Sequence, residues 1–444
     1  MMKWLNKANK VIKKNWNIEA LKDKQIEVID GLMNGNDVIG LLPTGYGKSM
    51  CYLIPPLISK MVMLIISPLI SLMDDQKDKL TKMGIQCAAL HSNNKNRLEE
   101  IDMVISGKIN IVYMSPEYLV RKTESEEEDE IYTGGIKLAR TLYNNDRLGF
   151  LAVDESHCCS VWGQDFRPEY KEIKVFREEF PDIPILAVTA TATNKVCTDI
   201  AKMLSLDKPI LVKASFDRPN LHIKVMIHEK IPTTKKKEIL RPKMEYVIPY
   251  LKKYSNDKII IYINNREETE ELAQELKGYG ALAYHAGFGK AKREDIQNKF
   301  ASGECKIIIS TIAFGMGIDQ IVRCIIIFGC PSSIEEYYQQ IGRGGRDGIL
   351  CETILYFNHS KLHIGKFMIN KNKLDPKVAA VKRINLDNIG TFAYLKTCRR
   401  KFILEYFNEK CNFKTCNNCD NCTVVKTENK TEDVYDKYSK MCEM

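Results

Sequence analysis

Short apolar runs recur along the chain between residues 37 and 328, and amphipathic stretches separate them. The runs are rich in Val and Ile, which is typical of strands buried on both faces. The stretches between them, such as 71–83 and 267–278, place apolar residues at helical spacing. Strands that alternate with helices form parallel sheets with crossover helices. The predicted strands are 37–42, 61–66, 110–115, 149–153 and 184–189, then 258–264, 281–286, 306–311 and 323–328.

The alternation restarts after SFDRPN, residues 215–220, whose composition is typical of turns. We therefore predict an α/β protein with two doubly wound parallel-sheet domains. The strand pattern stops near residue 358, and three later segments, 361–368, 377–384 and 391–407, have helical spacing. The predicted limits are 1–213 for the first domain, 214–356 for the second, 357–424 for a small helical module and 425–444 for a charged tail that we expect to be disordered.

Composition narrows the class of protein. The chain is 44% hydrophobic and 28% charged, as in ordinary globular proteins. Pro68 interrupts the apolar run Met61–Met73, which is too short to span a bilayer, so we expect no membrane partner. The net charge of +9 is compatible with a polyanionic partner. Most of the fifteen cysteines are scattered singly, which favours a reducing intracellular compartment, nucleus or cytoplasm (nucleoid) according to the host.

One loop has the chemistry of a phosphate site. LLPTGYGKSM, residues 41–50, follows a predicted strand and precedes a predicted helix, where backbone N–H groups can face oxyanions. The strict phosphate-loop pattern requires Gly at position 42, where this chain has Leu42 at the strand end. The alternative is a glycine-containing turn without a ligand. The candidate ligands of a nucleotide and Mg²⁺ are Thr44, Gly45, Gly47, Lys48 and Ser49.

Two acids support the nucleotide interpretation. Asp154 and Glu155 follow the predicted strand 149–153, and ligands of open α/β sheets bind at the carboxyl ends of strands. Asp154 would hold Mg²⁺, and Glu155 would orient and deprotonate the attacking water. Two acids after a strand are common by themselves, but here they occur in the same domain as the Lys-Ser loop.

The end of the chain carries a metal-binding pattern. Cys416, Cys419 and Cys422 have Cys-x-x-Cys-x-x-Cys spacing, which indicates zinc. A tetrahedral site needs a fourth ligand, for which Cys398 and Cys411 are both available. The alternative is a set of thiols without metal. Four thiolates leave no open position, so we expect a structural role for the ion.

These motifs together resemble the RecQ group of superfamily 2 helicases. The resemblance extends from Trp16 to Cys422. It rests on PTGYGKS and DESH together with SPLISLMDDQ (67–76), HCCSVWGQDFRPEY (157–170), TATAT (189–193), YHAG (284–287), STIAFGMGID (310–319) and YYQQIGRGGRDG (337–348). It implies two RecA-like domains and ATP hydrolysis stimulated by nucleic acid. It also implies that Cys398, before paired arginines, is the fourth zinc ligand.

The resemblance assigns further residues to the ATP site. Arg343 and Arg346 would reach the γ-phosphate from the second domain, so that hydrolysis requires domain closure. Asp319 would contact the ribose or the arginine loop. Gln25 would read the adenine edge. Lys22 stands where the family usually has Arg, and lysine lacks the flat guanidinium face that stacks on a base.

It also implies contacts to single-stranded DNA through its backbone, which give little sequence preference. Trp162, Phe166 and Arg167 would sense the strand from the aromatic-rich loop, although the two aromatics could instead belong to the core. In that loop the chain has Gln164 where the family commonly has His. The remaining expected contacts are Ser67, Ser115 and Thr311.

We therefore expect an ATP- and Mg²⁺-dependent DNA helicase with bound Zn²⁺ that acts on single-stranded and tailed duplex DNA, presumed 3′-to-5′, in DNA repair and recombination. The chain ends about twenty residues after Cys422, so we expect a short form without the family's winged-helix domain. A translocase that cannot separate strands, a non-catalytic DNA-binding or annealing protein, and an RNA substrate are the alternatives.

Overall fold

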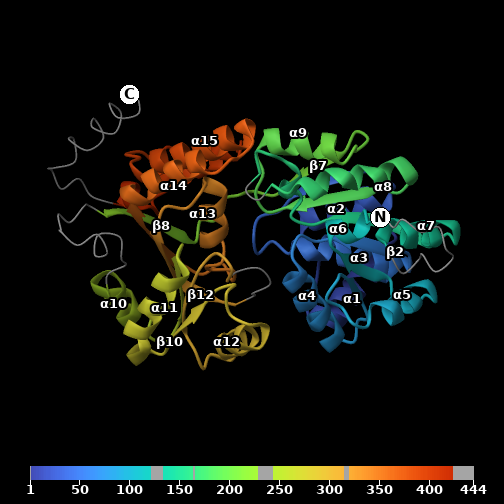
Figure 1. Ribbon diagram of the computed structural model, residues 1–444, viewed down its shortest axis with the longest axis horizontal. Helices are drawn as coiled ribbons and strands as arrows, with labels where there is room; N and C mark the ends of the chain where they lie inside the picture. Colours follow the sequence, from blue (N-terminus) through green and yellow to red (C-terminus); the bar gives the residue numbers. More distant parts are fainter. Residues whose placement is uncertain (1, 122–133, 164–165, 229–243, 315–319, 424–444) are drawn as a thin grey trace. The chain divides into compact units, whose positions relative to one another are not determined.

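The computed structural model describes residues 2–121, 134–163, 166–228, 244–314 and 320–423. The chain divides into two compact units, Met1–Ser215 and Phe216–Met444 (Figure 1). Within the described residues, no helix combines the length and apolar character that crossing a bilayer requires.

The first unit is built on seven parallel strands in the order β3-β4-β2-β5-β6-β1-β7. The helices α2, α3 and α4 cover one face of this sheet. Leu64 and Val112 point to the opposite face and are also fully buried, so the strands are apolar on both sides. The strands are β1 Val38–Leu41, β2 Val62–Ile66, β3 Ala88–Leu90, β4 Ile111–Met114, β5 Leu148–Val153, β6 Ile185–Thr189 and β7 Ile210–Lys213.

The second unit contains six parallel strands in the order β10-β11-β9-β12-β13-β8. Val247 and Leu251 of α10 and Leu272 of α11 pack into the apolar cluster on one face of this sheet. The strands are β8 Leu221–His228, β9 Lys258–Ile263, β10 Ala281–Tyr284, β11 Ile307–Ser310, β12 Val322–Gly329 and β13 Cys351–Asn358.

The two sheets have the same topology. When β8 is matched to β1, β9 to β2 and so on, both orders read third, fourth, second, fifth, sixth, first, and the first unit adds β7 at the edge. This repeat confirms the prediction of two doubly wound parallel sheets.

The helices of the first unit are α1 Leu5–Trp16, α2 Asp23–Met33, α3 Lys48–Ser59, α4 Ile70–Lys82, α5 Arg97–Ile105, α6 Pro116–Leu119, α7 Gly135–Asn144, α8 Lys174–Glu179 and α9 Asn194–Met203, with 3₁₀ turns η2 Ser156–Cys159 and η3 Pro168–Ile173. Those of the second are α10 Met244–Lys253, α11 Arg266–Glu275, α12 Lys290–Ser302, α13 Ile334–Ile341, α14 His359–Lys371, α15 Pro376–Ala393, α16 Arg399–Tyr406 and α17 Asp420–Thr423, with the 3₁₀ turn η4 Lys277–Tyr279. The helices α14 and α15 lie side by side (Figure 1).

All nine predicted strands are present, and four others, β3, β7, β8 and β13, did not stand out from the sequence. One helix prediction is wrong. Residues 391–407 do not form a single helix, because α15 ends at Ala393 and α16 begins at Arg399. Cys398 lies in the N-cap position of α16, where its sulfur accepts a hydrogen bond from the Lys401 N–H at 3.5 Å. The tail 425–444, which we predicted to be disordered, lies outside the described residues.

Candidate nucleotide site and metal centre

The predicted phosphate loop connects β1 to the start of α3. Gly45 and Gly47 have positive φ angles of 83° and 93°, which residues with a side chain adopt only with strain. A Cβ on Gly47 would also lie 2.6 Å from Nε2 of Gln25. Leu42 is fully buried in the core below the loop, so its departure from the strict pattern places no side chain among the phosphate-facing groups. Thr44 and Ser49 are half-buried.

Gln25 is bound to this loop. Its side chain is 4% exposed, and its Nε2 donates to the carbonyls of Tyr46 at 3.1 Å and Gly47 at 3.0 Å. Its Oε1 accepts from the N–H of Lys22 at 2.8 Å. The ammonium group of Lys22 lies 4.7 Å from the centre of the Tyr46 ring. The pair predicted to read adenine therefore also supports the phosphate loop, a role that the sequence reasoning missed.

The two acids after β5 meet the loop lysine. Nζ of Lys48 lies 3.0 Å from Oε1 of Glu155, and both side chains are largely buried. Asp154 accepts hydrogen bonds from the Tyr52 hydroxyl at 3.2 Å and from the Glu155 N–H at 2.9 Å. Burial and the neighbouring Glu155 raise the pKa of Asp154 from 3.8 to about 6, although Lys48 opposes the rise. Tyr52, on α3, is a further site residue that the sequence reasoning missed.

Glu155 is held in an unusual backbone conformation. Its φ of 46° and ψ of 44° are left-handed, which costs free energy in a residue with a side chain. The following turn η2 fixes this geometry, because the Ser156 hydroxyl donates to the carbonyl of Val188 at 3.1 Å. Nδ1 of His157 lies 2.8 Å from the Thr189 hydroxyl. The acids are thereby connected to β6 and to the TATAT segment that follows it.

The three hydroxyl residues predicted to contact DNA have different surroundings. Ser67 is 1% exposed, and its hydroxyl has no hydrogen-bond partner among the described residues. The Ser115 hydroxyl caps α6 by accepting from the Tyr118 N–H at 3.2 Å. The Thr311 hydroxyl accepts from the Ala313 N–H at 3.4 Å. Ser115 and Thr311 are half-buried, so they are closer to solvent than Ser67.

The two aromatic rings of the aromatic-rich loop each lie close to a lysine ammonium group, and neither ring is fully buried in the core. Trp162 and Phe166 are both half-buried, with Lys195 Nζ 2.9 Å and Lys171 Nζ 5.3 Å from the respective ring centres. Arg167 donates to the carbonyl of Pro68 at 2.7 Å, which ties this loop to the SPLISL segment. Gln164 lies outside the described residues.

In the second unit, Arg343 and Arg346 belong to the glycine-rich loop that follows α13 and are half-buried. Burial raises the pKa of the Tyr262 hydroxyl, and the positive charges of the two arginines oppose that rise. Two residues of the SFDRPN segment, Arg218 and Asn220, donate hydrogen bonds to the backbone of the loop. The sequence reasoning treated that segment as a domain seam and missed these contacts. Asp319 lies outside the described residues.

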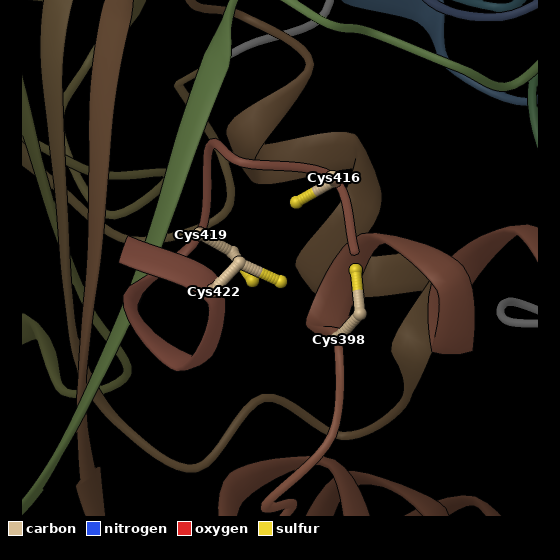
Figure 2. Close-up of side chains that lie close together, drawn as sticks. All are labelled: Cys398, Cys416, Cys419 and Cys422. Atoms are coloured by element: carbon tan, nitrogen blue, oxygen red, sulfur yellow. The ribbon is translucent and has the colours of Figure 1, made fainter. Parts of the chain in front are cut away.

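Four cysteines form a compact cluster. The sulfur atoms of Cys398, Cys416, Cys419 and Cys422 all lie within 4.8 Å of one another and point toward a common centre (Figure 2). A zinc ion with four Zn–S bonds of ~2.3 Å requires sulfur atoms about 3.8 Å apart, so the cluster fits a tetrahedral site. The Asn418 N–H donates to the sulfur of Cys416 at 3.4 Å. Cys411 is not a member of the cluster.

The cysteine-rich loop also covers an edge of the second sheet, where β8 is the last strand. The Ile223 N–H donates to the carbonyl of Asn418 at 3.4 Å, and the Val225 N–H donates to Oδ2 of Asp420 at 2.8 Å. Arg399 holds the same carboxylate through its Nε at 2.5 Å. Backbone groups that would otherwise be unpaired at the sheet edge are thus bonded to the metal-binding loop.

Three family models match the chain in succession. The DEAD/DEAH box helicase model matches residues 22–200, the helicase conserved C-terminal domain matches residues 242–348, and the RecQ zinc-binding model matches residues 362–423. The first contains the phosphate loop and acids, the second contains the arginine loop, and the third contains the cysteine cluster.

Curated relatives agree with this order of domains. The chain is 36% identical over 440 residues to the putative ATP-dependent RNA helicase R290 of Acanthamoeba polyphaga mimivirus, covering 98% of this chain and 76% of that protein. It is 36% identical to the ATP-dependent DNA helicase RecQ of Haemophilus influenzae, covering 94% of this chain and 63% of that protein. It is 34% identical to the ATP-dependent helicase SGS1 of Saccharomyces cerevisiae, of which it spans 27%.

Solved structures share the fold at lower sequence identity. The DNA-bound DUF1998 helicase MrfA aligns with a TM-score of 0.62 and 17% identity, covering 93% of this chain and 59% of that one. The Mycobacterium smegmatis helicase Lhr aligns with a TM-score of 0.58 and 16% identity, covering 83% of this chain and 49% of that one. The domain order, the relatives and the fold agree, and the chain belongs to the RecQ family of superfamily 2 helicases.

Proposed function

We propose that this chain is an ATP-dependent DNA helicase that couples ATP hydrolysis to 3′-to-5′ movement along single-stranded DNA and to duplex unwinding. The observation that carries the proposal is the group formed by Lys48, Asp154, Glu155 and Tyr52 at the carboxyl ends of parallel strands. One cation and two carboxylates meet beside a glycine loop at the start of a helix. This combination suits a nucleotide triphosphate and a divalent cation.

The ion pair between Lys48 and Glu155 gives the site a resting arrangement. A bound triphosphate would compete for the Lys48 ammonium, and Glu155 would then be available to orient and deprotonate water. Ser49 and Asp154 are the proposed Mg²⁺ ligands, and the ion would offset phosphate charge. Thr44, Gly45 and Gly47 would surround the phosphates with backbone N–H groups.

The remaining ATP-site assignments are also proposals. Arg343 and Arg346 would supply positive charge to the departing phosphoryl group, an effect worth roughly 10³ to 10⁵ in rate. Lys22 and Gln25 would recognise the base. Because Gln25 donates to the carbonyls of Tyr46 and Gly47, a base bound at Gln25 would act directly on the conformation of the phosphate loop. Asp319 would complete the site.

We propose zinc as a structural ion bound by the four clustered cysteines. Burial raises the pKa of the Cys416 and Cys419 thiols, so the protein alone disfavours their thiolate forms. A bound divalent cation would stabilise those thiolates. It would also hold Asn418 and Asp420 against β8, since both residues lie between zinc ligands in the sequence.

For DNA we propose backbone contacts at Ser67, Ser115 and Thr311, and base stacking on Trp162 and Phe166. The cations above the two rings would be displaced or would turn toward phosphates when a base stacks. Arg167 would report strand occupancy to the SPLISL segment through its bond to Pro68.

ATP turnover measured with and without single-stranded DNA tests the motor. Stimulation by DNA supports it, and unchanged turnover overturns both the helicase and the translocase. Unwinding of a 3′-tailed duplex compared with a 5′-tailed duplex then separates a helicase from a translocase that cannot open strands. Matched RNA oligonucleotides are a necessary competitor, because one similar protein bears the name of a putative RNA helicase.

Replacing the loop lysine tests the nucleotide site. We expect Lys48→Ala to abolish ATP turnover, because the phosphates lose their nearest cation, while the affinity for single-stranded DNA stays within about twofold. The control is Lys82→Ala, which removes an exposed lysine from α4 and should leave turnover unchanged. Measurable turnover by Lys48→Ala would contradict the assignment.

Removing a cysteine tests the metal centre. We expect Cys419→Ser to lose most of the bound zinc, measured by metal analysis, and to unfold at lower temperature, because Cys419 is fully buried in the cluster. Cys411→Ser removes a thiol outside the cluster and should keep its zinc. A zinc-replete Cys419→Ser protein with an unchanged melting temperature would refute the ligand set.

The raised pKa of Asp154 predicts a pH-dependent cost to stability. In the folded state the pKa of Asp154 is about 6, above its ordinary value of 3.8. The free-energy cost of ionising this carboxyl group in the folded protein therefore grows as pH rises from about 4 to about 6 and is constant above that range. We expect Asp154→Asn to raise the free energy of unfolding of the nucleotide-free protein by roughly 1–3 kcal/mol at pH 8.

The gain should shrink toward zero at pH 4, where the carboxyl group carries its proton in most folded molecules. Denaturant unfolding of the variant and the unsubstituted protein at pH 4 and pH 8 measures this gain in the free energy of unfolding. Asp154→Asn should also lose ATP turnover. An equal gain at pH 4 and pH 8 would show that Asp154 is not under electrostatic strain.

A further inference from the structure

The loop that carries Arg343 and Arg346 has little room for side chains at its glycines. It is glycine-rich between the two arginines, and Gly345 has a φ of 53°. A Cβ at Gly344 would collide with the sulfur of Cys351, and one at Gly345 would collide with the side chain of Asn220. The loop is therefore packed closely against its neighbours, and these neighbours determine where the arginines lie.

Two side chains of the preceding SFDRPN segment hold the backbone of this loop. Nη2 of Arg218 donates to the carbonyls of Gly344 at 2.8 Å and Gly345 at 3.0 Å. Nδ2 of Asn220 donates to the carbonyls of Gly345 at 2.7 Å and Ile349 at 2.9 Å. The carbonyls of Gly344, Gly345 and Ile349 are thus bound by donors that lie more than one hundred residues earlier in the sequence.

The segment that supplies these donors is itself fixed from the other side. The carbonyl of Pro219 accepts from Nη2 of Arg400 at 3.2 Å and from Nδ2 of Asn418 at 2.8 Å. The Cys351 N–H donates to the carbonyl of Asn220 at 2.9 Å. Residues 217–220 therefore connect the cysteine-rich module to the arginine loop through hydrogen bonds within the second unit.

Arg218 is a poorly solvated cation in the field of a like charge. Burial lowers the pKa of Arg218, and the like charge of Arg346 lowers it further. Placing a second guanidinium close to Arg346 costs free energy, which the charge-assisted hydrogen bonds to Gly344 and Gly345 offset.

We propose that Arg218 and Asn220 are positioning residues for Arg343 and Arg346. They fix the loop backbone and act on ATP hydrolysis through the two arginines, without touching nucleotide or DNA. This inference rests on the proposed function, since it requires that the arginines act in hydrolysis. A misplacement of about 1 Å in a catalytic group can cost ~10²-fold in rate, so a small loop shift is enough to matter.

The test is Asn220→Asp, which keeps the size of the side chain and replaces its donor by an oxygen that faces two carbonyls. We expect kcat for DNA-stimulated ATP hydrolysis to fall about tenfold or more. The KM for ATP and the affinity for single-stranded DNA should stay within about twofold, and the zinc content should not change. The matched control is Asn145→Asp, which removes an exposed amide donor to the Thr141 carbonyl in the first unit. It should keep the wild-type kcat.

A double variant separates positioning from a general structural role. If Asn220 acts through Arg343, the pair Asn220→Asp and Arg343→Ala should have the same kcat as Arg343→Ala alone. Additive losses would overturn the inference, as would an unchanged kcat in Asn220→Asp. Should Asn220→Asp fail to fold, Arg218→Lys takes its place, because it keeps the charge but loses the planar fork that reaches two carbonyls.

The outcomes distinguish this inference from the proposed function. If Arg343→Ala keeps full turnover, the catalytic assignment of that arginine is wrong. If Arg343→Ala is impaired while Asn220→Asp and Arg218→Lys are both normal, the proposed function stands and only the positioning role is refuted.

Discussion

The candidate nucleotide site depends on a costly arrangement of charge at the carboxyl end of β5. Asp154 and Glu155 are adjacent acids at the end of a buried strand, and the ammonium group of Lys48 lies 3.0 Å from the Glu155 carboxylate. Burial, and then the like charge of Glu155, raise the pKa of Asp154. In the proposed function, a divalent cation and a polyphosphate would relieve this cost when they bind.

That arrangement requires a rigid frame around it. Glu155 adopts a left-handed conformation, and the turn η2 fastens it to β6 through Ser156 and His157. On the opposite side, the buried amide of Gln25 fastens the phosphate loop to the start of α2. These hydrogen bonds connect the turn after Glu155 and the loop before Lys48 to segments that are remote in sequence. A shift in either segment would change the distance between Lys48 and Glu155.

The sequence predicted the features that have a period or a fixed spacing. Nine strands were found as contiguous apolar runs, and the cysteine spacing led to the metal centre. The strand β8 was missed because it alternates: Ile223 and Val225 are buried, whereas Met226 is exposed. The strand β7 was missed because it lies at the edge of its sheet, where Ile210 and Leu211 are exposed and strand propensity alone does not identify a strand. Arg218 and Asn220 could not be predicted, because bonds from side chains to remote carbonyls leave no pattern in the sequence.

The placement of the metal-binding module has a physical reason. An open parallel sheet leaves unpaired N–H groups at its edge, and β8 is such an edge strand. Asn418 and Asp420 pair with those groups, and they can do so only while the loop between the cysteines keeps its shape. The same loop binds Pro219, which precedes β8 and lies between the two residues that hold the arginine loop. The metal-binding module is therefore connected through Pro219, Arg218 and Asn220 to the arginine loop, on which phosphoryl transfer would depend. We therefore expect loss of the metal to loosen the β8 edge and, through Pro219, the segment that holds the arginine loop.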